Sequence, residues 1–330
     1  MRRLRGLYIL DEETFPLVYG PTEQQDIERH VEFIAPLQTR ASIAQHPGLL
    51  NSVEVIFSGW SPPKFDDAFF ELAPNLKAIF YAAGQISIAD SAWKRGLIVT
   101  TAQLANSQPV AEYSLAMIIL SLKQSWRLVR ETREQRTFVD RNGVAGCYGA
   151  TVGIISLGAI GRALIKLLAQ LDVSVVLYDP FVTGAQADEL GVELVTLDEV
   201  FTRADVVSLH APLRPETVGL ITGAHLRSMN PRATFLNTAR GAIVRMDQLI
   251  EVATDRPDLQ FILDVTDPDE PPHRESPLYD LPNVLLTPHI AGSSGGECRR
   301  MGRWMVEELE RFVAGEPLRW SVVPPSGNAS

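Results

Sequence analysis

Residues 151–180, TVGIISLGAIGRALIKLLAQLDVSVVLYDP, constrain the fold more than any other part of this chain. The apolar run at 152–155 predicts a buried strand, and apolar side chains at helical spacing over 163–171 predict a helix directly after a glycine turn. A second β-branched run, at 173–178, predicts another strand. A strand, a helix and a second strand in this order form a βαβ unit, which requires a parallel sheet.

The turn inside this unit has the residues of a dinucleotide-binding motif. Gly158 and Gly161 precede the helix, whose free N–H groups and positive dipole favour a pyrophosphate. Asp179 follows Gly158 by 21 residues (179 − 158), the spacing of an acid that binds ribose hydroxyls, and its charge repels a 2′-phosphate. These residues predict binding of NAD(H) rather than NADP(H). Ser156 replaces the first glycine of the motif, which costs little unless the turn requires a positive φ there.

The rest of the chain predicts two domains of the same class. A length of 330 residues is enough for two cores. Strand-like runs alternate with helical patterns on both sides of the glycine turn, which predicts two doubly wound parallel sheets, followed by a helix at 297–313. The runs lie at 7–10, 53–57, 76–81 and 97–100 and, after the βαβ unit, at 206–209, 234–237, 260–265 and 284–287.

Two helical segments precede the βαβ unit. Residues 109–123 are apolar on nearly every face, so they predict a helix buried between domains or between subunits, with Pro109 in its first turn. In the next segment arginine recurs every three residues, at positions 127, 130, 133 and 136. This spacing winds around a helix instead of forming one basic stripe, so it favours a solvated helix or a subunit-contact arm over a nucleic-acid surface.

Composition excludes several other classes. A formal net charge of −10 argues against nucleic acid as a partner, and no apolar run approaches the roughly 20 residues that span a bilayer, so no membrane partner is expected. Two cysteines, Cys147 and Cys298, cannot form a disulfide framework and predict reduced thiols in a cytoplasmic protein. The histidine spacings suggest no metal site.

Candidate catalytic groups follow the last three predicted strands. Arg240 follows the first of them, Asp269 and Glu270 follow the second, and His289 follows the third. Carboxyl ends of parallel strands converge at one edge of a doubly wound sheet, so these side chains are expected to meet. An arginine can bind a carboxylate and polarise a carbonyl, and a histidine beside a carboxylate can transfer a proton. Together they predict hydride transfer to an α-keto acid.

Longer motifs resemble those of the D-isomer-specific 2-hydroxyacid dehydrogenases, a family that includes phosphoglycerate dehydrogenases and glyoxylate/hydroxypyruvate reductases. The resemblance extends from residue 76 to residue 322, whereas residues 1–75 match only in pattern. It is carried by YAAGQISIAD, NSQPVAEYSLAMIIL, VGIISLGAIG, LHAPLRPETVGLI, NTARGAIV, LDVTDPDEPP, SPLYDLPNVLLTPHIAG and RFVAGEPL.

The resemblance implies a segmented α/β architecture. A Rossmann NAD-binding domain, residues 104–290, is inserted into a smaller flavodoxin-like substrate domain formed by residues 1–103 and the C-terminal return 291–330. It also implies a homodimer that is joined mainly through the NAD-binding domains. These boundaries place the apolar helix at the junction of the domains or at the subunit contact.

The resemblance also assigns roles to the candidate residues. Arg240 holds the substrate, and His289 is the acid/base, tuned by an adjacent carboxylate. Counting forward from Asp264 places Asp269 at the position of the family's glutamate. Counting back from the Thr-Pro-His motif at 287–289 places Glu270 there, and we favour Glu270 for its longer reach. The substrate carboxylate is expected on Arg240 and on the backbone of residues 82–84, that is, Ala82, Ala83 and Gly84.

By the same resemblance, cofactor contacts come from the turns that follow successive strands. The expected cofactor-binding residues are Ser156, Gly158, Ala159, Ile160, Gly161, Asp179, His210, Ala211, Pro212, Thr238, Ala239, Arg240, Asp264, His289 and Gly292. Among them, Asp264 is expected near the nicotinamide amide.

These observations predict an NAD-dependent oxidoreductase that interconverts a small 2-keto acid and its D-2-hydroxy acid. A glyoxylate- or hydroxypyruvate-type substrate is favoured. A D-3-phosphoglycerate dehydrogenase is one alternative, and a non-catalytic NAD-sensing scaffold with the same residues is another.

Overall fold

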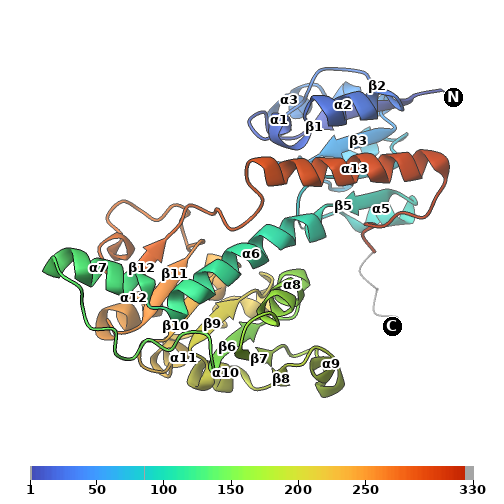
Figure 1. The fold of residues 1–330 in the computed structure, drawn as a ribbon. Helices are drawn as coiled ribbons and strands as arrows, with labels where there is room; N and C mark the ends of the chain where they lie inside the picture. The colour runs from blue at the N-terminus through green and yellow to red at the C-terminus, as the bar shows by residue number, and fades with distance from the viewer. Residues whose placement is uncertain (1, 85, 324–330) are drawn as a thin grey trace. The chain divides into compact units, whose positions relative to one another are not determined.

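The computed structural model describes residues 2–84 and 86–323. The chain forms two compact units, one of Met1–Ser107 with Ser293–Ser330 and the other of Gln108–Gly292. Each unit contains one parallel sheet (Figure 1). The sequence predicted crossings after residues 103 and 290; in the structure the first crossing lies inside a helix that continues through the boundary.

The sheet of the first unit has the order β2-β1-β3-β4-β5, which is the doubly wound 2-1-3-4-5 arrangement of flavodoxin-like folds. Alternate strand residues enter two cores on opposite faces, as Phe57 and Ile56 of β3 do. The strands are β1 (Leu4–Ile9), β2 (Val31–Phe33), β3 (Val55–Ser58), β4 (Ala78–Tyr81) and β5 (Ile98–Thr101).

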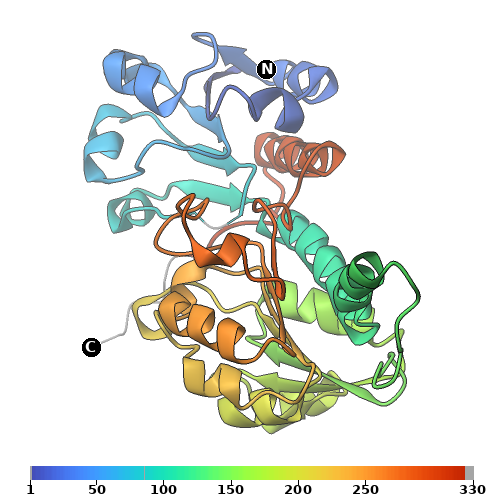
Figure 2. The same cartoon turned by 90° about the vertical axis from the view of Figure 1, so that its left-hand side faces the viewer.

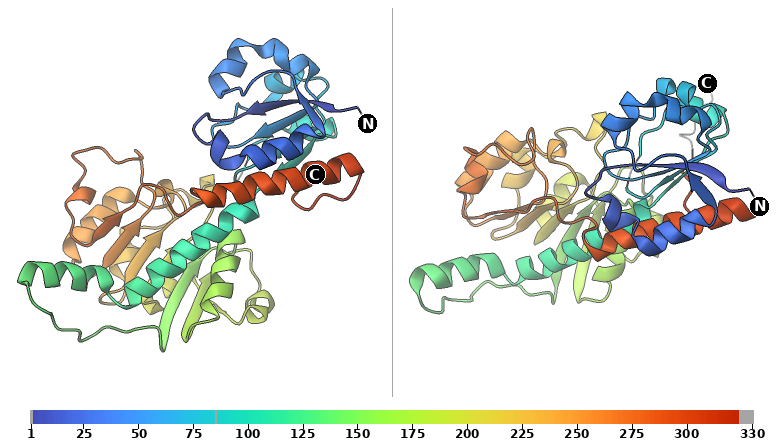
Figure 3. Two further views of the ribbon diagram at one scale, coloured as in Figure 1. Left: turned by 45° about the horizontal axis from the view of Figure 1, so that its top comes forward. Right: turned by 90° about the horizontal axis from the view of Figure 1, so that it is seen from above.

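Helices cover both faces of this sheet. The long C-terminal helix α13 (Gly296–Ala314) packs against α1 (Phe15–Val18) and α2 (Pro21–Glu28) on one face (Figure 3). Gly302 of α13 permits a close approach, because a Cβ there would lie 2.0 Å from the Val18 carbonyl oxygen. The opposite face is covered by α3 (Arg40–Gln45), η1 (Pro47–Ser52), α4 (Asp67–Leu72) and α5 (Asp90–Lys94).

The sheet of the second unit has the order β12-β11-β10-β9-β6-β7-β8. Counted from β6, this is the Rossmann order 3-2-1-4-5-6 with one further strand at the edge, so the sequence prediction of two doubly wound domains is confirmed. The strands are β6 (Ala150–Ile155), β7 (Val173–Tyr178), β8 (Glu193–Leu194), β9 (Val206–Leu209), β10 (Thr234–Asn237), β11 (Gln260–Leu263) and β12 (Val284–Leu286).

Helices also lie on both faces of the second sheet (Figure 2). One core is formed with α6 (Gln103–Leu122), α8 (Ala159–Leu168) and α9 (Gly184–Glu189). The other is formed with α10 (Leu197–Arg203), α11 (Gly223–Arg227) and α12 (Met246–Asp255). The remaining elements are α7 (Ser125–Gln135) and the short helices η2 (Pro215–Thr217), η3 (Gly241–Ile243) and η4 (Pro277–Tyr279).

Helix α6 differs from its prediction at its start. It begins at Gln103, so Pro109 lies inside the helix and not in its first turn. The residues before Pro109 continue the helix, and Asn106 donates its backbone N–H to the Ala102 carbonyl at 3.0 Å. One face of α6 packs into the core through Ala111 and Ile118, so only part of its surface is available to another molecule.

Candidate active site

The turn between β6 and α8 lies at the switch point of the second sheet, where neighbouring strands are followed by helices on opposite faces. Gly158 is the N-cap of α8, and a Cβ there would meet no atom within 4 Å, which leaves open space in front of the helix N-terminus. Gly161 packs against the turn, because a Cβ on it would lie 2.4 Å from the Ser156 carbonyl oxygen. The turn therefore fits a pyrophosphate: open in front of the helix and compact behind it.

Ser156 adopts φ = 80°, a left-handed conformation that costs a non-glycine residue about 1–2 kcal/mol. The turn therefore requires a positive φ at Ser156, which is the case in which replacing the glycine has a cost. The serine hydroxyl lies 3.3 Å from Oδ2 of Asp179, which also accepts the Leu157 N–H at 2.8 Å. Oδ1 of Asp179 accepts the Phe181 N–H at 2.9 Å. These bonds fix the half-buried carboxylate beside the turn.

His210 lies at the carboxyl end of β9 and is buried. Its Nε2 is 2.8 Å from the Ser208 hydroxyl, and its Nδ1 is 3.5 Å from the Thr238 hydroxyl. Burial lowers the pKa of His210 to about 4, so the ring is neutral at pH 7. The side chain thus joins the ends of β9 and β10, and it does not carry a charge to this edge of the sheet.

Arg240 is exposed in the turn that follows β10. Asn237 shapes this turn: its Oδ1 accepts the Ala239 N–H at 2.9 Å, and its Nδ2 donates to the Arg240 carbonyl at 3.1 Å. The sequence analysis assigns no role to Asn237, the first residue of NTARGAIV. Its position at the end of a strand is the available signal, because asparagine there commonly bonds the backbone two residues later.

The Arg240 turn lies against the loop that carries the candidate acids. A Cβ on Gly241 would lie 2.1 Å from the carbonyl group of Thr266, so only glycine allows this approach. In the loop, the peptide bonds Asp267–Pro268 and Glu270–Pro271 are cis, and the Thr266 hydroxyl donates to the Asp269 carbonyl at 2.7 Å.

Glu270 is the acid whose carboxylate contacts His289, through Oε1 and the imidazole Nδ1. Asp269 bonds within the loop through its backbone. The His289 side chain is 49% exposed and that of Glu270 is 39% exposed, so the pair is accessible from outside. With Nδ1 facing the carboxylate, Nε2 is the nitrogen that remains for another molecule.

The backbone around His289 is held by Asp264, which is only 1% exposed. Oδ1 of Asp264 accepts the Ile290 N–H at 2.9 Å, and Oδ2 accepts the Ala291 N–H at 2.9 Å. His289 itself has φ = 54°, a conformation that persists in a non-glycine residue only when its surroundings impose it.

The candidate residues of the first unit follow β4. Ala82 donates its N–H to the Ser58 carbonyl at 2.8 Å, so the turns after β3 and β4 are adjacent. Ala82 and Ala83 are buried, and Gly84 is partly exposed. Their role in substrate binding stays a prediction.

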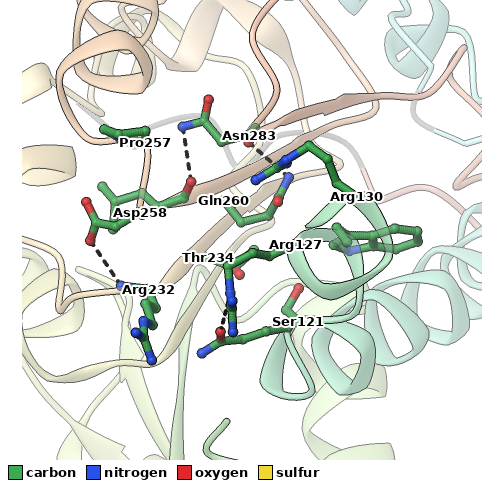
Figure 4. Close-up of a pocket in the computed structure, with 12 residues that line it drawn as sticks. Ser121, Arg127, Arg130, Arg232, Thr234, Pro257, Asp258, Gln260 and Asn283 are labelled. Atoms are coloured by element: carbon green, nitrogen blue, oxygen red, sulfur yellow. Dashed lines mark hydrogen bonds between the residues drawn. The ribbon is translucent and has the colours of Figure 1, made fainter. Parts of the chain in front are cut away.

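A small pocket lies elsewhere in the second unit, between α7 and the starts of β10 and β11 (Figure 4). Its volume is about 20 Å³, which is space for one water molecule. It is lined by Arg127, Thr234, Gln260 and Asn283, among others. Thr234 and Gln260 begin their strands, so the pocket is at the edge opposite to the candidate catalytic residues.

Comparisons with known proteins agree with this geometry. Residues 115–291 match the domain described as "D-isomer specific 2-hydroxyacid dehydrogenase, NAD binding domain". A D-3-phosphoglycerate dehydrogenase of Archaeoglobus fulgidus is 33% identical over 272 residues, which are 81% of this chain and 51% of that protein. A glyoxylate reductase of Korarchaeum cryptofilum is 32% identical over 267 residues, 79% of this chain and 78% of that protein.

Among solved structures, the TT0316 protein from Thermus thermophilus superposes with a TM-score of 0.75 at 27% identity, over 97% of this chain and 100% of that chain. The chain spans about half the length of the phosphoglycerate dehydrogenases that it matches. No helix in the described part of the chain is long and apolar enough to cross a membrane. The chain belongs to the D-isomer-specific 2-hydroxyacid dehydrogenase family, and residues 115–291 are its NAD-binding domain.

Proposed function

We propose that this protein is an NAD(H)-dependent oxidoreductase that interconverts a small 2-keto acid and its D-2-hydroxy acid. The observation that carries the proposal is the accessible Glu270–His289 pair, held next to the Arg240 turn at the carboxyl edge of a Rossmann sheet. An imidazole with one nitrogen on a carboxylate and the other free is suited to donate a proton to a carbonyl oxygen. An adjacent arginine is suited to bind the carboxylate of the same molecule.

In this mechanism each residue has one task. The Arg240 guanidinium binds the substrate carboxylate and polarises the keto group. His289 donates the proton from Nε2 to the keto oxygen, and Glu270 stabilises the imidazolium before the transfer. The bound nicotinamide supplies the hydride. We further propose that the backbone of residues 82–84 binds the substrate carboxylate.

The cofactor is proposed to lie along the turns that end β6, β7, β9, β10 and β11. The open space in front of Gly158 receives the pyrophosphate, and the Asp179 carboxylate receives the ribose hydroxyls. Thr238 borders the nicotinamide ribose, and Asp264 lies near the amide.

Turnover of a panel of 2-keto acids with NADH tests the proposal. Glyoxylate or hydroxypyruvate is expected to be reduced with kcat/KM of about 10⁴ M⁻¹s⁻¹ or more, within the usual enzyme range. Faster turnover of 3-phosphohydroxypyruvate would favour a D-3-phosphoglycerate dehydrogenase, the activity named for several relatives. NADH binding without turnover of any member would favour an NAD-sensing scaffold.

NADH is expected to be preferred over NADPH by about 100-fold in kcat/KM, because placing the Asp179 carboxylate beside a 2′-phosphate costs several kcal/mol. Asp179→Ala should narrow the ratio by raising activity with NADPH relative to NADH. Asp188→Ala removes an exposed carboxylate from α9 and should leave the ratio unchanged. Equal kcat/KM for the two cofactors in the unmodified protein would refute this assignment.

Glu270→Gln should lower kcat/KM for reduction about 10–100-fold, because the imidazole Nδ1 of His289 loses its hydrogen bond to a charged carboxylate. Asp269→Asn is the matched control, because Asp269 bonds in its loop through the backbone. If the Glu270 variant keeps the kcat/KM of the unmodified protein, the contact between this carboxylate and His289 does not support the reaction.

The protein is proposed to be a homodimer joined through its NAD-binding domains. The segment around α7 carries unusually exposed large apolar side chains, Val129 (55%), Phe138 (95%) and Tyr148 (88%), which are typical of a surface that another chain covers. Light scattering at micromolar concentration should give twice the chain mass of 36.4 kDa. Phe138→Asp should shift the protein toward the monomer, whereas a monomeric mass of the unmodified protein would contradict the dimer.

A further inference from the structure

A chain of hydrogen bonds connects α6 to the loop that carries His289. The Tyr113 hydroxyl on α6 lies 3.0 Å from Oγ1 of Thr287, and Thr287 donates to Oδ1 of Asp264 at 2.6 Å. A hydroxyl has one hydrogen, and that of Thr287 is directed to the carboxylate, so Tyr113 must be the donor to Thr287. Tyr113 and Thr287 thus form one directed chain of hydrogen bonds that ends on the Asp264 carboxylate.

The tyrosine remains a donor at ordinary pH. It is half-buried, and burial is the main cause that raises its pKa above the usual value of 10, with a further contribution from the negative charge of Asp264. The hydrogen bond with Thr287 acts in the opposite direction. Hydrogen bonds arranged head to tail polarise one another, which strengthens the bond that reaches the carboxylate.

Asp264 collects the donors that define the His289 loop. It accepts the Thr287 hydroxyl and the N–H groups of Ile290 and Ala291, and the His289 N–H bonds the Thr287 carbonyl at 2.9 Å. The buried carboxylate therefore holds the Thr287 side chain before His289 and the backbone directly after it. A buried carboxylate that loses one of its donors is left undersatisfied and favours a different arrangement of the loop.

The same bonds lie where the chain passes between its two units. The first crossing is within α6, six residues before Tyr113, and the second follows Gly292. On the side of the first unit, the Ser293 N–H donates to Oδ1 of Asn106 at 3.0 Å. The two crossing segments are thus bonded to each other both before and after the boundary. Helix α6, although it carries no candidate catalytic residue, is tied to the backbone of the acid/base.

We propose that Tyr113 and Thr287 are positioning residues for proton transfer: through Asp264 they keep the His289 loop in its strained conformation, with Nε2 directed to the substrate. This inference rests on the proposed role of His289 as the proton donor. Neither residue needs to touch substrate or cofactor. Their loss should therefore slow the chemical step much more than it weakens cofactor binding, which rests mainly on the proposed pyrophosphate and ribose turns.

Three substitutions separate positioning from simple stabilisation. Thr287→Val removes the donor to Asp264 and should lower kcat about 10–50-fold, the usual range for losing a hydrogen bond to a charged group. Tyr113→Phe should lower kcat about fivefold. Thr287→Ser keeps the hydroxyl and should restore most of the activity. Thr254→Val, at an exposed threonine of α12 whose hydroxyl donates to the Ile250 carbonyl, is the matched control for Thr287→Val and should change nothing.

The readouts are kcat, KM for the 2-keto acid, the Kd of NADH, and the kinetic isotope effect with deuterated NADH. Positioning predicts a lower kcat, a Kd of NADH that changes much less than kcat, and a larger isotope effect, because the chemical step then limits turnover. The double variant with Tyr113→Phe and Thr287→Val should have a kcat no lower than that of Thr287→Val alone, because both substitutions break the same hydrogen-bond chain. The inference would be overturned if the unmodified enzyme is active and Thr287→Val has the same kcat. A Thr287→Val variant whose only change is a lower Tm would overturn it as well. An unmodified protein that turns over no 2-keto acid would overturn the proposed function as well.

Discussion

We expect His289→Ala to lower kcat for 2-keto acid reduction by about 10²–10⁴-fold, the usual contribution of a positioned general acid. The imidazole is the group that we propose as the proton donor, with Nδ1 on Glu270 and Nε2 available. The Kd of NADH should change little, because the proposed pyrophosphate and ribose sites lie on other turns. Pre-steady-state and steady-state rates with the best substrate of the panel provide the measurement.

His273→Ala is the matched control for this variant. His273 is exposed and follows the same strand as Glu270, but it lies outside the Glu270–His289 pair. Its loss should leave kcat unchanged. A kcat of His289→Ala within about threefold of the unmodified enzyme would exclude the histidine as the proton donor.

We expect Arg240→Ala to lower kcat/KM by about 10²–10³-fold, which corresponds to the loss of a hydrogen-bonded charge pair in a site. Because the guanidinium is proposed both to anchor the substrate carboxylate and to polarise the keto group, KM should rise and kcat should fall together. Arg240→Lys keeps the charge but loses the planar fork, so it should recover only part of the activity. Arg274→Ala, an exposed arginine of the loop after β11, serves as the control. A rise in KM with unchanged kcat would limit Arg240 to substrate binding.

The architecture could be predicted because its signals are local. Apolar runs separated by helical patterns indicate the central strands of both sheets, and the glycine turn indicates the switch point. Strands β2 and β8 were not predicted because they contain three and two residues, too few for an alternation to be visible. The sequence predicts too late a start for α6, because proline is common in the first turn of a helix, whereas the helix begins at Gln103 and Pro109 lies inside it.

The site could be predicted only as a set of candidate residues. Counting along the sequence leaves both Asp269 and Glu270 possible and favours Glu270 only for its longer reach, because the length of a loop does not reveal which side chain reaches across it. The conformation of Ser156 was also open, since φ depends on how Gly161 packs beneath the turn. The Tyr113–Thr287 bond joins residues 174 positions apart, and no local pattern signals such a contact.

The most direct test is the product formed from hydroxypyruvate and NADH. Chiral analysis of the reaction, with NADH consumption followed in parallel, measures activity and stereochemistry together. We expect one D-glycerate for each NADH oxidised by the unmodified protein. Formation of L-glycerate, or no consumption of NADH with hydroxypyruvate or any other 2-keto acid of the panel, would contradict a D-specific 2-keto acid reductase built on Arg240, Glu270 and His289.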